Sequence, residues 1–304
     1  MSFLTKTILE FIIFTFKCVL ALFIVTIVFI GLIIYQNSIV KVTNYQVKNK
    51  KIPKSFDGYK IIQLSDIHND YSGDKLSKLV EKIKKEQPEM IVITGDLVDS
   101  IRYDEDNTLE FIESVTSIAP TYFVYGNHDV VIDGDIHSPG LLKEIENKGA
   151  RVLNIKNEKI TKNGEIINLI GIQDPSTVYN IEDLRVLNSE KEIIESMLTS
   201  VTMDINTTDE FTLLLSHRPE HFDIYEKYEI DLALSGHAHG GQFRIPFVGG
   251  LYAPHQGIFP KYTSGKHSKN NTEMIVSRGL GASRFPFRVF NTPEIVSITL
   301  KTDI

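Results

Sequence analysis

The amino-acid sequence predicts an α/β fold preceded by one N-terminal transmembrane helix. Two observations carry this prediction. An uncharged apolar segment runs from Cys18 to Tyr35, and beyond it short apolar runs alternate with a helical pattern. Strands that alternate with amphipathic helices are typical of a largely parallel sheet with helices packed on it. The chain has 304 residues, 42% hydrophobic and 23% charged, which is enough for one large domain or two small ones.

The apolar segment is long enough to cross a membrane. Its residues, Cys18 to Tyr35, would span about 27 Å as a helix, close to the thickness of a hydrocarbon core. A buried core helix normally keeps a polar face, and a signal peptide has a shorter apolar run followed by a small-residue cleavage site. Because the segment shows neither feature, we assign residues 1–40 to a single membrane anchor.

The residues after the anchor are basic. No acid occurs between Gln36 and Phe56, whereas five lysines do: Lys41, Lys48, Lys50, Lys51 and Lys54. Two interpretations remain open, a juxtamembrane patch attracted to anionic lipid headgroups and a solvated linker. In either case we expect residues 41–58 to form a basic linker and residues 59–304 to form the folded domain.

The folded domain begins with a βαβαβ pattern. Strands are expected at 60–66, 90–96 and 121–127, with helices over 74–87 and near 107–117. Later strands are expected at 165–172, 211–217, 231–237, 273–279 and 294–300. Two polar segments complete the chain. We interpret 175–210, with a helical stretch over 181–198, as an insertion at the rim, and 263–272 as an exposed loop.

Five of the predicted strands end in polar clusters that can bind metal ions, namely SDIH, GDLVD, GNHD, SH and GHAH. In an open α/β sheet, sites are built at the carboxyl ends of the strands. The clusters supply seven candidate ligands: Asp66, His68, Asp96, Asn127, His217, His237 and His239. Asp66 and His68 are two residues apart, as are His237 and His239, so an extended chain would aim both members of a pair to one side.

Seven oxygen and nitrogen ligands without a thiolate are more than one ion needs. Carboxylate and imidazole together favour Mn, Fe or Zn over a purely Ca or Mg site. Each motif alone is more often structural, but five in order, each after a strand, indicate a metal site. The net charge of −7 argues against a general nucleic-acid binder, and the single cysteine, Cys18, excludes a disulfide framework.

The ordered motifs D-x-H, G-D-x-x-D, G-N-H-D, a lone His and G-H-x-H resemble those of the calcineurin-like metallophosphoesterases, from about Tyr59 to Leu300. The anchor, GHAHGGQFRIP and FPFRVFNTPEIVSITL resemble the membrane-anchored YaeI/YkuE-type branch. The resemblance implies a four-layer α/β sandwich of two mixed β-sheets flanked by helices. It also implies two divalent transition metals (Mn, Fe or Zn), one on Asp66, His68, Asp96 and His239, the other on Asp96, Asn127, His217 and His237.

The resemblance further implies hydrolysis of a phosphomonoester, phosphodiester or pyrophosphate bond by a hydroxide that bridges the two metals. His128 is expected to give a proton to the leaving group. Asp99 is expected to pair with His128, as the matching residues do in serine/threonine phosphatases of the superfamily. The alternative is that Asp99 caps the following helix. Three arginines are candidates for phosphate recognition: Arg244, Arg284 and Arg288.

Two other functions remain open, a membrane-tethered non-catalytic metal-binding scaffold and a nuclease. A scaffold would be expected to lose ligands, and the charge and the anchor argue against a nuclease. The anchor favours a lipid-linked or cell-envelope phosphoester as the substrate, because tethering raises the effective concentration near lipids. The resemblance places the domain outside the cytoplasm, at the cell membrane. The positive-inside rule disagrees, since five lysines follow the anchor and only Lys6 and Lys17 precede it.

Overall fold

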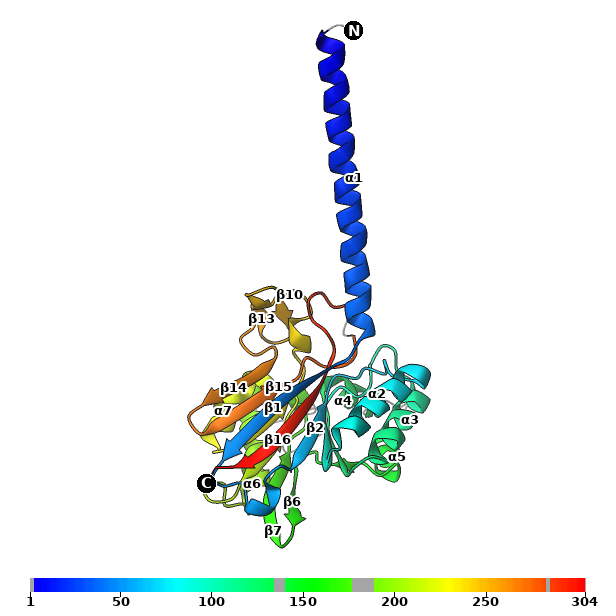
Figure 1. Cartoon of the computed structure of the whole chain (residues 1–304). Coiled ribbons are helices and arrows are strands. Elements are labelled where there is room, and N and C mark those ends of the chain that lie inside the picture. The colour runs from blue at the N-terminus through cyan, green and yellow to red at the C-terminus, as the bar shows by residue number, and fades with distance from the viewer. Residues whose placement is uncertain (1–2, 134–139, 177–188, 283–284, 304) are drawn as a thin grey trace.

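The computed structural model describes residues 3–133, 140–176, 189–282 and 285–303 (Figure 1). Its first helix, α1 (Phe3–Ser38), projects from one end of the folded domain. In the described residues it is the one helix long and apolar enough to cross a membrane, and an 18-residue window within Lys6–Ser38 has a mean hydropathy of 3.0. The predicted transmembrane helix is thus present as a candidate membrane span.

The segment expected to be a linker is part of the folded domain. Residues Lys41–Asn49 form strand β1, which pairs in parallel with the last strand, β16 (Glu294–Thr302), along its full length. A short helix, Lys54–Phe56, follows and buries Phe56. The linker prediction for 41–58 is therefore wrong, because pairing with β16 orders a segment whose own side chains are mostly polar.

Two mixed six-stranded sheets form the domain. The first has the order β1-β16-β2-β3-β4-β5, and the second β14-β15-β9-β8-β7-β6. Besides β1 and β16, the first sheet contains β2 (Lys60–Leu64), β3 (Met90–Thr94), β4 (Thr121–Val124) and β5 (Arg151–Val152). The second sheet contains β6 (Lys156–Lys162), β7 (Glu165–Gly171), β8 (Thr212–Leu215), β9 (Leu232–Ser235), β14 (Gly265–Lys269) and β15 (Thr272–Val276).

Helices cover the outer faces of both sheets. The first sheet packs against α2 (Gly73–Glu86), α3 (Glu105–Thr116) and α5 (Leu141–Asn147), and the second against α6 (Glu190–Thr202) and α7 (Phe222–Lys227). A third hydrophobic core lies between the two sheets and includes Val92, Leu213 and Leu234. Strands covered on both faces read as continuous apolar runs, as in MIVIT of β3. The predicted four-layer α/β sandwich is confirmed.

The early part of the prediction matches the structure closely. β2, β3 and β4 run parallel, as the βαβαβ pattern predicts. The prediction of a loop over 263–272 is wrong, because β14 and β15 form an antiparallel hairpin there. Helix α6 buries Ile194 and Leu198 against the second sheet, so it is a layer of the fold and not a rim insertion. The remainder of the predicted helical stretch, 181–188, lies outside the described residues.

Two small hairpins lie between the second sheet and the end of the domain from which α1 leaves (Figure 1). One pairs β10 (Arg244–Ile245) with β11 (Gly249–Gly250), and the other pairs β12 (Tyr252–Ala253) with β13 (Gly257–Ile258). Both follow directly after the GHAHGG segment. They therefore extend the chain from the carboxyl ends of the strands toward α1.

Candidate metal centre

The candidate ligands lie in tight turns directly after the strands. Five of them have a positive backbone φ, between 45° and 66°: Asp66, His68, Asp96, His237 and His239. A residue other than glycine costs roughly 1–3 kcal/mol in this conformation, so the surrounding structure must hold it there. The prediction that an extended chain aims these side chains is wrong. Left-handed turns aim them.

The glycines of GHAHGG allow close approach of the backbone to neighbouring groups. A Cβ atom on Gly236 would lie 1.9 Å from Ser65 Oγ, and one on Gly240 would lie 2.1 Å from Asn291 Oδ1. Gly240 also has a φ of +63°. Asn291 Nδ2 donates a hydrogen bond to the carbonyl of His239 at 2.7 Å. A side chain at either glycine would displace the loop that carries both histidines.

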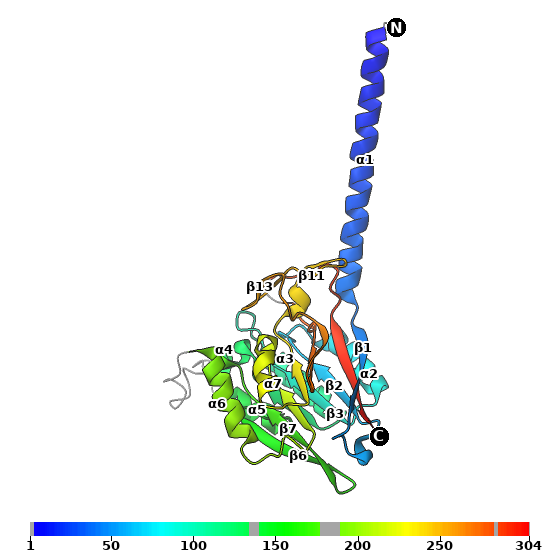
Figure 2. The ribbon, with the colours of Figure 1, turned by 90° about the vertical axis from the view of Figure 1, so that its left-hand side faces the viewer.

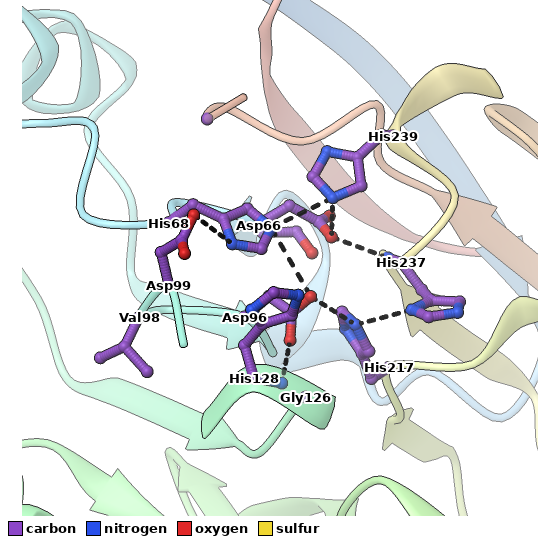
Figure 3. A network of polar contacts seen from close by, with 12 residues as sticks. Asp66, His68, Asp96, Val98, Asp99, Gly126, His128, His217, His237 and His239 are labelled. Carbon is purple, nitrogen blue, oxygen red and sulfur yellow. Dashed lines mark hydrogen bonds and ion pairs between the residues drawn. The ribbon is translucent and has the colours of Figure 1, made fainter. Parts of the chain in front are cut away.

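The first group of candidate ligands gathers side chains from both sheets. Asp66, His68, Asp96 and His239 each offer one atom, and these atoms all lie within 4.8 Å of one another (Figure 3). His68 Nε2 is 3.6 Å from Asp96 Oδ2, and His239 Nε2 is 3.3 Å from Asp66 Oδ1. The two imidazole Nε2 atoms face each other at 3.1 Å. Four ligand atoms therefore converge on one buried point.

The second group shares Asp96 with the first. Asp96, His217 and His237 offer ligand atoms within the same 4.8 Å. His217 Nε2 lies 3.3 Å from Asp96 Oδ2 and 3.1 Å from His237 Nδ1. His217 Nδ1 donates to the carbonyl of Thr94 at 2.7 Å, because a carbonyl oxygen can only accept. This hydrogen bond turns Nε2 toward the centre, as hydrogen bonds to the other ring nitrogen of metal-binding histidines do.

Several buried polar atoms of the candidate ligands have no hydrogen-bond partner within the described residues. Two of them, Asp66 Oδ2 and Asn127 Oδ1, are oxygens of predicted ligands. Asn127 is the first residue of helix α4 (Asn127–Asp133). An unpaired buried oxygen is costly, and coordination to a cation would satisfy it. The donor set, with its facing imidazoles and shared carboxylate, therefore fits two divalent cations.

Burial and the shared carboxylate set the charges of the histidines. Burial lowers the pKa of His68 to about 4, and it lowers the pKa values of His237 and His239 well below the ordinary value. These three imidazoles are neutral at pH 7, the state that a metal ligand requires. Burial acts in the same direction on His217, but the Asp96 carboxylate outweighs it and raises the pKa of His217 to about 10. A cation at the second group would displace this proton.

His128 lies at the centre but is not paired with Asp99. Its backbone N–H donates to Asp96 Oδ1 at 3.0 Å, and its Nδ1 accepts from the backbone N–H of Ser100 at 3.1 Å. Asp99 instead binds Arg102, with Oδ2 2.6 Å from Nη2, and accepts the N–H of Ile101. The predicted Asp99–His128 pair is therefore wrong. Asp99 does not cap the following helix either, because Asp104 caps α3.

The candidate phosphate-binding arginines brace the loops around the centre. Arg288 is fully buried, donates to the carbonyls of Arg278 and Gly281, and places Nη2 3.4 Å from His239 Nδ1. Arg244 Nη1 donates to the carbonyl of Gly240 at 2.7 Å. The third candidate, Arg284, lies outside the described residues. The structure thus places Arg244 and Arg288 in loop-bracing contacts, which their sequence positions do not reveal.

Sequence reasoning missed a carboxylate that joins two of the ligand loops. Asp129 accepts the N–H of Val98 at 3.0 Å through Oδ1 and the N–H of Gly126 at 2.8 Å through Oδ2. These contacts tie the turn after β3, which carries Asp96, to the turn after β4, which carries Asn127. The only sequence signal for this role is that Asp129 closes the G-N-H-D motif.

Comparison with known proteins agrees with this geometry. A family model described as calcineurin-like phosphoesterase matches residues 59–241. The Bacillus subtilis metallophosphoesterase YkuE is 30% identical over 269 residues, 86% of this chain and 86% of YkuE. The UDP-2,3-diacylglucosamine pyrophosphatase LpxG of Chlamydia muridarum is 25% identical, over 81% of this chain and 85% of LpxG. A Danio rerio transmembrane protein with a metallophosphoesterase domain is 28% identical, over 86% of this chain and 57% of that protein.

The family match covers more than half of the chain and contains all seven candidate ligands. Members of this family use a dinuclear divalent metal centre, and the two residue groups that share Asp96 supply the ligand clusters for one. The chain is a hydrolase acting on phosphoric ester bonds, and it belongs to the calcineurin-like phosphoesterase family, in its YkuE-type branch.

Proposed function

We propose that the chain binds two divalent transition metal ions and hydrolyses a phosphomonoester, phosphodiester or pyrophosphate bond of a lipid-linked or cell-envelope substrate. The observation that carries the proposal is the shared carboxylate of Asp96, which belongs to both ligand groups. Asp66, His68 and His239 complete the first group; Asn127, His217 and His237 complete the second. When bound, the metals supply a water of lowered pKa and neutralise charge on the phosphoryl oxygens.

The protein's own contribution to proton transfer centres on His128. Since Nδ1 accepts from the Ser100 N–H, the neutral ring carries its proton on Nε2. The His128 ring lies edge-on to the His68 ring, with centroids 4.7 Å apart, and the His128 backbone N–H is hydrogen-bonded to Asp96. We propose that the protonated His128 ring, with its Nδ1–H directed to the Ser100 hydroxyl 2.9 Å away, gives its Nε2 proton to the leaving oxygen and becomes neutral. Asp99 acts elsewhere, holding Arg102 and facing His68 Nδ1 at 3.9 Å.

The proposed substrate class rests on the anchor and on one relative. LpxG is named for a pyrophosphatase reaction on a diacylated nucleotide sugar. The candidate membrane span would keep the catalytic domain next to such amphiphiles. We propose that the metals are Mn, Fe or Zn, from the carboxylate and imidazole ligands.

A substrate screen tests the proposal. The full chain, purified in detergent with Mn²⁺, is assayed on a soluble monoester, a soluble diester, a nucleotide-sugar pyrophosphate and a lipid-linked pyrophosphate. We expect turnover that is lost in Asp96→Asn and kept in Asp74→Asn, a control in the first turn of α2. Absence of turnover on all four substrates, with metal bound, would refute the hydrolytic proposal. Faster turnover of soluble than lipid-linked substrate would refute only the substrate class.

We further propose that the catalytic domain lies outside the cytoplasm of the cell membrane, on the resemblance to the anchored branch. Protease treatment of intact cells tests this. The domain should be digested in intact cells, while a cytoplasmic control protein survives. Protection of the domain until the cells are lysed would place it in the cytoplasm, where the positive-inside rule puts it.

A further inference from the structure

A band of large apolar side chains is exposed at the end of the domain from which α1 leaves. They come from the two small hairpins and from the loop before β16, and we call them the apolar rim: Ile245, Phe247, Val248, Ile258, Phe259 and Phe290. The exposed fractions of Phe247 and Ile258 are 110% and 71%. Both views place these hairpins beside the domain end of α1 (Figures 1 and 2). A patch of this kind marks an interaction surface.

The apolar rim is fixed to the candidate membrane span without a spacer. α1 ends at Ser38, and β1 begins at Lys41. The side chain of Asn37 accepts the N–H of Arg288 at 2.9 Å and donates to the Arg288 carbonyl at 2.9 Å. The loop before β16 is therefore hydrogen-bonded to the last turn of α1. A bilayer crossed by α1 would meet the domain at this loop.

One contact sets the depth of the rim. The rings of Phe29 and Phe290 lie 6.2 Å apart. Phe29 precedes the end of α1 by about 14 Å at 1.5 Å per residue. The uncharged part of α1 begins at Cys18, and about 20 residues from there, roughly 30 Å of helix, reach Asn37. A span of this length puts Phe29 among the acyl chains, and Phe290 at the same level.

The stretch of sequence that contains the rim is basic. Between Leu232 and Pro293 the sequence contains one acidic residue, Glu273, although the chain as a whole carries a net charge of −7. The same stretch contains seven cations: Arg244, Lys261, Lys266, Lys269, Arg278, Arg284 and Arg288. Basic segments next to a membrane are attracted to anionic headgroups.

We propose that the apolar rim is a membrane-docking face, which inserts into the lipid bilayer that α1 spans. The partner is the lipid surface itself. An open groove of about 350 Å³, lined by rim residues and by Arg244, lies in this face. Arg244 also binds the carbonyl of Gly240, so the face is joined directly to the GHAHGG loop. Docking holds the candidate metal centre against the headgroup region instead of leaving it free on a tether.

Tryptophan fluorescence in nanodiscs tests the insertion, because the chain has no tryptophan of its own. Full-length Phe247→Trp and Phe259→Trp are each reconstituted in phosphatidylglycerol/phosphatidylcholine nanodiscs, with and without bromine on the acyl chains. The matched control is Met203→Trp. Met203 is 75% exposed and follows α6, before the chain enters the amino end of β8, so it faces away from the bilayer.

We expect bromine quenching of both rim tryptophans to be several-fold stronger than quenching of the Met203→Trp control, with blue-shifted emission. If one rim variant fails to fold, the other carries the test. Quenching of the rim tryptophans no stronger than that of the control would overturn the proposal. The readout needs no turnover, so its failure is separate from failure of the proposed hydrolysis.

Discussion

The two halves of the candidate metal centre are held in different ways. In the half around His217, a backbone carbonyl fixes the ring through Nδ1, and the imidazole stays protonated up to a pKa of about 10. In the half around His68, Nδ1 has no hydrogen-bond partner within the described residues and faces the Asp99 carboxylate at 3.9 Å. Burial lowers the pKa of His68 to about 4. The His217 ring is therefore oriented by a hydrogen bond and carries a positive charge, whereas the His68 ring is neutral.

The Asp96 carboxylate contacts two histidines that differ in charge. Asp96 lies 3.3 Å from His217 Nε2 and 3.6 Å from His68 Nε2. When no cation is present, the proton on His217 balances the negative charge of Asp96. We call the half around His217 the second half and the half around His68 the first. On binding a metal, the second half loses the His217 proton and gains the cation. The first half has no such proton to lose.

Removal of the shared carboxylate should have the largest effect. Asp96→Asn takes a charged ligand from both halves at once. We expect kcat/KM to fall by more than about 100-fold, the upper range for loss of a residue that only orients a metal ligand. Circular dichroism should show an unchanged fold. Activity within tenfold of wild type would mean that Asp96 does not join the two halves.

Single-half variants should separate the two sites. His217→Ala and His68→Ala each remove one imidazole from one half, so each should lose about one metal ion per chain and most of the activity. Elemental analysis of the purified chain, beside the Asp74→Asn control, measures the ratio. Loss of both metals from either variant would show that the halves do not load independently.

The pH dependence of metal binding should differ between the halves. A pH of about 8 lies below the His217 pKa of about 10, so His217 holds a proton there. Metal binding at the second half should therefore release about one proton. The affinity of the second half for the metal should fall about tenfold for each pH unit by which the pH is lowered. His68 and Asp66, with pKa values of about 4 and 6, have already lost their protons there. Calorimetry of each single-half variant in two buffers would show equal proton release if this account is wrong.

His128 should affect chemistry without affecting metal content. We expect His128→Gln to lower kcat by roughly 10²–10⁴-fold on esters with poor leaving groups, and by much less on p-nitrophenyl esters. Ser100→Ala removes the hydroxyl 2.9 Å from His128 Nδ1 but keeps the backbone donor, so its loss should be smaller. Equal losses on good and poor leaving groups would remove the proton-donor role.

Asp99→Asn should have the smallest effect. It should change metal binding at the first half and leave the role of His128 unchanged. The substitution weakens the contact with Arg102 and the negative charge facing His68. We expect a modest loss of affinity for one metal, with no change in leaving-group dependence. A leaving-group dependence like that of His128→Gln would restore the Asp99–His128 pair that the structure lacks.

The sequence predicts most of the fold, because buried parallel strands read as unbroken apolar runs. β2, β3 and β4 are found where KIIQL, MIVIT and TYFV predict them. β1 could not be predicted, because KVTNYQVKN is mostly polar and becomes a strand by pairing with β16. Strand ends likewise predict which side chains meet, but not how each turn aims them. That is why six of the candidate ligands meet in the two groups that share Asp96, while Asp99 turns to Arg102.

The number of metal ions bound per chain is the direct test of a dinuclear centre. The full chain, purified in detergent and loaded with Mn²⁺, should hold two ions per chain by elemental analysis, because two ligand groups share Asp96. Asp96→Asn should hold fewer than one, and Asp74→Asn should still hold two. A wild-type chain that holds one ion or none after loading would contradict a dinuclear centre.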